Sequence, residues 1–88
     1  MLHESHDRAA VAVRALSPLL REVFILHYIE GLPYASVAEI LGITSGAARL
    51  RAKRARESLR ANLLPMLAPE VHAAVQAEAA AELRSRRA

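Results

Sequence analysis

A cluster of cationic side chains is the part of this sequence with the clearest chemical use. Residues 49–60 contain one anion, Glu57, and six cations, which are Arg49, Arg51, Lys53, Arg54, Arg56 and Arg60. A helix face built only for solubility usually interleaves both signs. Such cations bind DNA phosphates and read base edges in the major groove. The cluster therefore predicts a DNA contact, and the alternative is a solvated face of a bundle helix, where Lys and Arg are good helix formers.

A pair of helices joined by a glycine is expected to position this cluster. Gly42 can adopt the positive φ of a sharp helix exit. Ile43 is expected to fill the space at the bend between the two helices, and Thr44 is a good N-cap for a second helix from Ser45. The first helix has apolar residues at helical spacing, which are Val37, Ala38, Ile40 and Leu41. The second has an apolar stripe beside its cations, made of Ala48, Ala52, Ala55 and Leu59. This pattern predicts a helix-turn-helix with a cationic second helix.

Two helices are expected before this pair. The first runs from about Asp7 to Leu16, and the second runs from Pro18 to Glu30, with Ser17 as its cap. The second is the most apolar segment of the chain, and its apolar residues cover more than one face. Part of that surface is expected to pack on the first helix and the helix-turn-helix. The remainder is wide enough for a protein partner, but core packing alone is the favoured interpretation.

A last helix is predicted from Pro69 to about Arg84, after Pro65 ends the cationic helix. Most of its surface is alanine, so three roles stay open: loose packing on the domain, contact with a partner, or a frayed tail. The predicted fold class is all-α, a compact helical domain with a helix-turn-helix, about four helices plus a C-terminal helical extension. Residues 1–64 would form the domain, and residues 65–88 the Ala-rich extension.

Composition excludes several classes of protein. The chain has 88 residues, a net charge of +3, 53% hydrophobic residues and no cysteine, so disulfides and thiolate metal sites are excluded. No apolar run approaches a membrane span, and we expect a cytoplasmic protein. His3 and His6 form a conceivable metal pair, but no third ligand is evident. The sequence shows neither the paired carboxylates nor the Ser-His-Asp set that would suggest an enzyme. No cofactor is expected.

The segment from Leu16 to Leu63 resembles region 4 of sigma-70-type RNA polymerase sigma factors, especially the extracytoplasmic-function group. The matching motifs are L-S-P-L-L-R-E-V-F at Leu16–Phe24, E-G-L-P-Y at Glu30–Tyr34, V-A-E-I-L-G-I-T at Val37–Thr44, S-G at Ser45–Gly46 and R-A-R at Arg54–Arg56. The resemblance implies a four-helix domain whose last helix enters the major groove of the −35 promoter element. It also implies docking on the β-flap of bacterial RNA polymerase and, in many members, capture by an anti-sigma factor.

The resemblance assigns roles to individual positions. Base and phosphate reading falls to Arg49, Lys53 and Arg54, and phosphate binding at the helix start falls to Thr44, Ser45 and Gly46. Further expected phosphate contacts are Arg51 and Arg56, and a weaker, pH-dependent one is His27. For Arg51 the alternative is a stem laid along the core, and for His27 it is a buried or merely exposed ring.

Four positions depart from the family pattern. Leu50 stands where the family often has Ser; it is expected to touch a thymine methyl or to mark altered or lost DNA reading. Ala47 and Ala48 replace the usual Thr and Val, and Pro33 replaces a capping Ser. The resemblance covers no region 2, the part that melts the −10 element, so we expect that this chain alone does not start transcription as a sigma factor does.

The functional hypothesis is a DNA-binding transcription-initiation module that recognises double-stranded promoter DNA and docks on RNA polymerase. The alternative is a sigma-like protein-interaction module, an anti-sigma-bound domain or decoy, that does not itself read DNA. The helix-turn-helix of a response regulator shares the A-x-x-x-G-I core but fits the L-S-P and R-A-R motifs less well.

Overall fold

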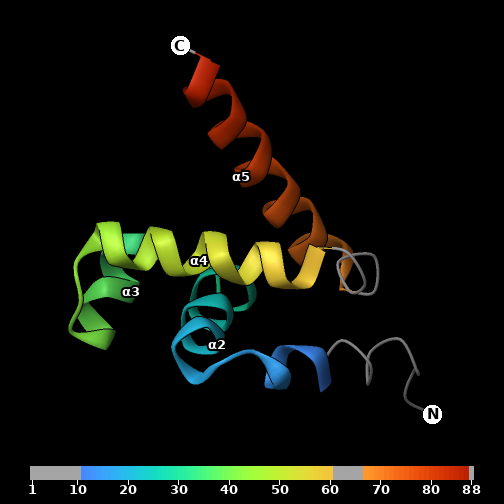
Figure 1. The fold of residues 1–88 in the computed structure, drawn as a ribbon. Coiled ribbons are helices and arrows are strands. Elements are labelled where there is room, and N and C mark those ends of the chain that lie inside the picture. The colour runs from blue at the N-terminus through green and yellow to red at the C-terminus, as the bar shows by residue number, and fades with distance from the viewer. Residues whose placement is uncertain (1–10, 61–66, 88) are drawn as a thin grey trace.

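The computed structural model describes residues 11–60 and 67–87, and all regular structure within these ranges is helical (Figure 1). Residues 11–15 are helical, and the elements that follow are α2 (Pro18–Phe24), the π-helical turn η1 (Ile25–Ile29), α3 (Tyr34–Leu41), α4 (Ser45–Arg60) and α5 (Pro69–Arg87). The predicted all-α class is confirmed, and the described bounds lie within a few residues of the predicted ones. Asp7, Pro65 and the predicted domain boundary after residue 64 fall outside the described residues.

The helix formed by α2 and η1 begins at the predicted proline. Pro18 occupies the first turn, where its missing N–H removes no hydrogen bond. Ser17 holds the N-cap position, but its side chain forms no capping hydrogen bond, which corrects the expected cap. Its carbonyl instead accepts the N–H of Arg21 at 2.9 Å.

The turn η1 widens the end of this helix. The Glu30 N–H donates to the Ile25 carbonyl at 2.9 Å, which is the i to i+5 pattern of a π-helix. Gly31 then leaves the helix with φ 78°. Single π turns occur frequently at functional sites, and this one carries His27 and Tyr28.

The helix-turn-helix of α3 and α4 forms as the local sequence predicts (Figure 1). Gly42 takes the left-handed conformation, with φ 69° and ψ 37°, and the Ile43 N–H closes on the Ala38 carbonyl at 3.0 Å. The Thr44 hydroxyl accepts the Ala47 N–H at 3.0 Å, so the predicted cap of α4 is confirmed.

The core lies where α2, α3 and α4 meet. Its fully buried members include Val23, Phe24, Val37, Ala48, Ala52, Ala55 and Leu59. Because three of the four apolar α4 positions are alanine, its backbone can approach α2 and α3 closely. Ile40, expected on the apolar face of α3, is 60% exposed and does not belong to this core.

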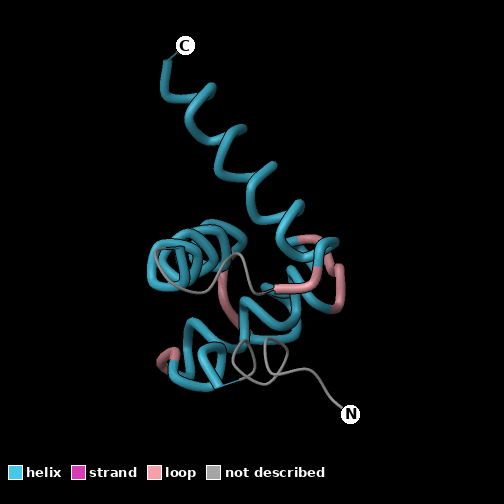
Figure 2. The backbone as a smooth tube through the Cα atoms, turned by 90° about the vertical axis from the view of Figure 1, so that its right-hand side faces the viewer, coloured by secondary structure: helices cyan, strands magenta, loops and turns pink. Residues whose placement is uncertain are grey.

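The last helix, α5, packs on the body through residues between Val71 and Glu82. Val75 is 2% exposed and belongs to the core cluster, with Leu67 and Val71 packed against it. The last turns of α5 extend beyond the other helices (Figure 2). Of the three roles left open for this segment, the structure therefore shows packing on the domain.

Among the helices of residues 11–60 and 67–87, none is both long enough and apolar enough to cross a membrane.

Candidate nucleic-acid interface

The predicted DNA-contacting residues of α4 divide into an exposed set and a buried one. Arg49, Leu50 and Arg54 are exposed, and Arg51 and Lys53 are partly exposed. Leu50 and Arg54 lie one turn apart, on the side of the helix away from the buried alanine stripe.

Thr44, Ser45 and Gly46 gather at the exposed start of α4. The first N–H groups of a helix point outward without intrahelical partners, and the helix dipole adds partial positive charge there. The Thr44 hydroxyl is engaged as the cap, which leaves its O–H hydrogen for an outside acceptor. The structure therefore brings these three residues next to the exposed cations of α4.

Tyr34, the first residue of α3, supports the most N-terminal cation of α4. The Arg49 guanidinium lies over the Tyr34 ring, 4.9 Å from its centroid. The His27 ring stacks on Tyr34 at a centroid distance of 3.9 Å and an interplanar angle of 16°. The Tyr34 ring therefore contacts both His27 and Arg49.

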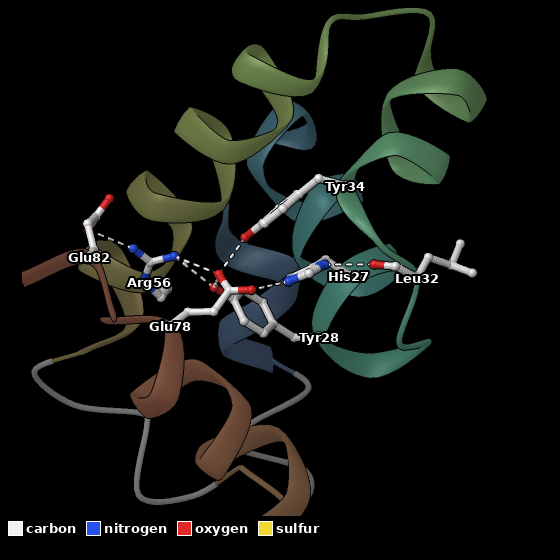
Figure 3. Close-up of polar contacts among 7 residues, drawn as sticks. All are labelled: His27, Tyr28, Leu32, Tyr34, Arg56, Glu78 and Glu82. Carbon is white, nitrogen blue, oxygen red and sulfur yellow. Dashed lines mark hydrogen bonds and ion pairs between the residues drawn. The ribbon is translucent and has the colours of Figure 1, made fainter. Parts of the chain in front are cut away.

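Arg56 and His27 point into the protein, toward α5 (Figure 3). Arg56 is 8% exposed and donates to the Tyr28 hydroxyl at 2.8 Å and to Glu82 at 2.9 Å. His27 Nδ1 donates to the Leu32 carbonyl at 2.7 Å, and its Nε2 contacts Glu78. In this arrangement both side chains are engaged within the protein, and their expected phosphate contacts stay predictions.

Glu78 is the centre of this network (Figure 3). We call Glu78 and the four side chains that contact it, His27, Tyr28, Tyr34 and Arg56, the Glu78 basket. Its Oε1 accepts from the Tyr34 hydroxyl at 2.5 Å, the Tyr28 hydroxyl at 2.8 Å and the Arg56 guanidinium at 3.2 Å. The two ring nitrogens of His27 face oxygen atoms, one of the Leu32 carbonyl and one of the Glu78 carboxylate.

The contacts of the basket go with a shifted pKa at four of its members, which are Glu78, Tyr28, Tyr34 and Arg56. Burial alone would raise the pKa of Glu78, but the hydrogen bonds from Tyr34, His27 and Tyr28 outweigh it and hold that pKa below the ordinary value. Burial raises the pKa of Tyr28 to about 12, and burial with the Glu78 hydrogen bond raises the pKa of Tyr34 as well. For Arg56, burial lowers the pKa, but the contacts with Tyr28 and Glu82 raise it above its usual value.

Sequence reasoning missed Tyr28, Tyr34, Glu78 and Glu82 as functional candidates. One signal was available: the chain has only two tyrosines, and both lie near the glycine-proline connection before α3. Nothing local marks Glu78, which lies 44 to 51 residues beyond three of its partners.

The predicted metal pair, His3 and His6, lies outside the described residues. Within residues 11–60 and 67–87, no group of three or more His, Asp or Glu side chains could hold a metal ion.

Comparison with known proteins places most of the chain in one family. The family described as "Sigma-70, region 4" matches residues 6–59. The ECF RNA polymerase sigma factor SigJ of Mycobacterium tuberculosis is 43% identical over 53 residues, which cover 60% of this chain and 17% of that protein. The probable RNA polymerase sigma factor RfaY of Xanthomonas campestris pv. campestris is 38% identical over 64 residues, 72% of this chain and 16% of the relative.

A third relative, the RNA polymerase sigma factor CarQ of Myxococcus xanthus, is 43% identical over 49 residues, 56% of this chain and 28% of its own length. The chain thus spans less than a third of each of these curated relatives. No solved structure matches it. The chain therefore belongs to the sigma-70 region 4 family, and an ECF RNA polymerase sigma factor is among its relatives.

Proposed function

We propose that this chain binds a −35-like element of double-stranded promoter DNA by placing α4 in the major groove. The observation that carries the proposal is the division of α4 into two sides. Its alanine stripe is buried, while Arg49, Leu50 and Arg54 are exposed. A helix with this division can insert into a groove without losing its packing on α2 and α3.

The proposed contacts follow from where each side chain lies. Exposed Arg49 and Arg54 reach base edges or phosphates, and Leu50, 45% exposed, offers an apolar surface for a thymine methyl. Arg51 and Lys53 supply further phosphate contacts, and the start of α4, at residues 44–46, holds one phosphate through backbone N–H groups.

A second contact, with RNA polymerase, is part of the proposal. A single module of this size is expected to bind DNA weakly alone, in the range of non-specific contacts. Tethering through the β-flap would raise the effective DNA concentration. Leu19 and Ile29 are 55% and 52% exposed on the helix formed by α2 and η1, and each is a candidate apolar contact for that docking.

The same apolar residues support a second candidate function, a protein-interaction module captured by an anti-sigma factor. In that case Leu19 and Ile29 would be covered by the anti-sigma protein, and α4 would not need to read DNA.

The two functions are separated by a binding-site selection. A pool of duplexes with a randomised central segment is selected with the chain in the presence of bacterial RNA polymerase, and mobility shifts on the selected duplex are then measured with and without polymerase. Promoter recognition predicts enrichment of one sequence, tighter binding with polymerase, and affinity that falls steeply as salt rises. Absence of any enriched sequence, with polymerase still bound, would favour the protein-interaction module.

A further inference from the structure

We infer that α5 is an intramolecular competitor of DNA: the donors of the Glu78 basket form a binding site for a backbone phosphate, and Glu78 occupies that site when no duplex is bound. This inference rests on the proposed function.

The first support is the chemistry of the basket. A guanidinium, a histidine ring and two phenol hydroxyls converge on one carboxylate. All four can donate hydrogen bonds, and the guanidinium is cationic. A phosphodiester is an anion of the same charge with oxygen acceptors, so the same donors suit it.

The second support is the place of the basket in the helix-turn-helix. When such a pair docks on a duplex, its first helix lies against the phosphate backbone while the second enters the groove. Tyr34 begins the first helix, α3. The guanidinium of Arg49, a residue of the proposed interface, lies over the Tyr34 ring, 4.9 Å from its centroid. The basket is therefore joined directly to the surface on which a strand of DNA would lie.

The third support is the position of α5 beside α4. Arg49 and Arg56 are seven residues apart and thus share one flank of α4, about 10 Å from each other along the axis. Lys53 and Arg60 line the groove between that flank and α5. Glu78 and Glu82 of α5 thus place two carboxylates on a basic flank and reduce its attraction for DNA.

Displacement of α5 would break the contacts of Glu78 and Glu82 with the body and expose Val75, which is the one fully buried side chain of α5 among the described residues. Glu78 is itself partly exposed. A duplex that supplies a phosphate to Arg56 and His27 would replace the contacts that α5 loses.

The test compares Glu78→Gln with Glu70→Gln in the full chain, on the duplex selected above. Both changes remove one negative charge from α5, but Glu70 is exposed in the first turn and lies outside the basket. We expect Glu78→Gln to tighten binding about three- to tenfold relative to Glu70→Gln. The dependence of log K on log salt should also steepen by about one unit, because one more phosphate is neutralised.

A second variant makes the test specific to the basket. Arg56→Gln should weaken duplex binding in the Glu78→Gln background, where Arg56 can meet a phosphate, and should change it little in the otherwise unaltered chain. Circular dichroism confirms the helical content of each variant.

Three outcomes would oppose these ideas in different ways. If Glu78→Gln binds no more tightly than Glu70→Gln while binding still depends on Arg49, α5 is not a competitor and the proposed function stands. If Glu78→Gln binds the duplex more weakly than Glu70→Gln does, the contact of Glu78 with Tyr34 supports DNA binding and the inference is wrong. If no folded protein, altered or unaltered, binds a duplex, the proposed function fails and the inference fails with it.

Discussion

The Tyr34 hydroxyl donates to Glu78 Oε1 at 2.5 Å, across 44 residues of sequence. Tyr34 begins the helix-turn-helix, and Glu78 lies in the middle of α5. The same tyrosine ring supports Arg49, so one side chain connects α5 to the exposed cations of α4. This relationship makes α5 part of the region that surrounds the proposed interface.

Replacing Arg49 with alanine should weaken duplex binding by about 1–3 kcal/mol, because a base or phosphate contact is lost. The measurement is a mobility shift on the selected duplex. Arg84→Ala is the control, since Arg84 is an exposed arginine near the end of α5. A folded Arg49→Ala protein that binds as the unaltered chain does would contradict the proposed role of α4.

Replacing Gly42 with alanine should lower the free energy of unfolding by about 1–2 kcal/mol. A Cβ at this position would meet no atom within 4 Å, so the cost comes from the backbone at φ 69° alone. Gly46→Ala is the matched control, and it should stabilise the chain slightly because Gly46 lies inside α4 without a positive φ. Equal effects at both glycines, measured by urea denaturation, would refute the left-handed turn.

Replacing Val75 with alanine should lower the free energy of unfolding by about 1–3 kcal/mol, because Val75 is 2% exposed in the core cluster. Val11→Ala removes the same atoms from a side chain that is 57% exposed and should cost much less. If the two substitutions cost the same, α5 does not pack on the body in solution.

Acid should remove the stabilising contribution of Glu78. Because its folded-state pKa lies below the ordinary value of 4.5, ionised Glu78 stabilises the fold above that pH, and the contribution disappears as the pH falls through the lowered pKa. The groups that face Glu78 are His27, Tyr28, Tyr34 and Arg56. The difference in melting temperature between the unaltered chain and Glu78→Gln should therefore shrink below about pH 4.5. A difference that stays constant down to pH 2 would show that Glu78 has no lowered pKa.

Alkaline titration reports on the same basket, because both tyrosines of the chain belong to it. Burial and Glu78 raise the pKa of Tyr28 to about 12, against the opposing effect of Arg56, and the pKa of Tyr34 is also raised. The neutral phenols stabilise the fold below the ordinary tyrosine pKa of about 10, and this stability is lost as the pH rises further. Tyrosinate absorbance should thus appear at a higher pH than in free tyrosine. In Glu78→Gln it should appear at a lower pH than in the unaltered chain. Ordinary titration of both tyrosines in the folded chain would rule out the basket.

Local chemistry allowed the sequence by itself to determine the helices and the turn. Pro18 and Pro69 set helix starts, Gly42 accepts a positive φ that other residues avoid, and Thr44 caps the helix that follows it. Each of these effects involves neighbours within four or five residues, so each can be read from sequence spacing. The family motifs depend on the same local order.

Only the tertiary structure decided which cations of α4 face solvent and what α5 does. Arg56 lies at the border between the buried stripe and the exposed face, where helical spacing alone permits either direction. The carboxylates of Glu78 and Glu82, 22 and 26 residues further along, draw it inward. Contacts over such separations depend on how the helices pack, because an ion pair forms only where the fold brings its two charges within a few ångströms.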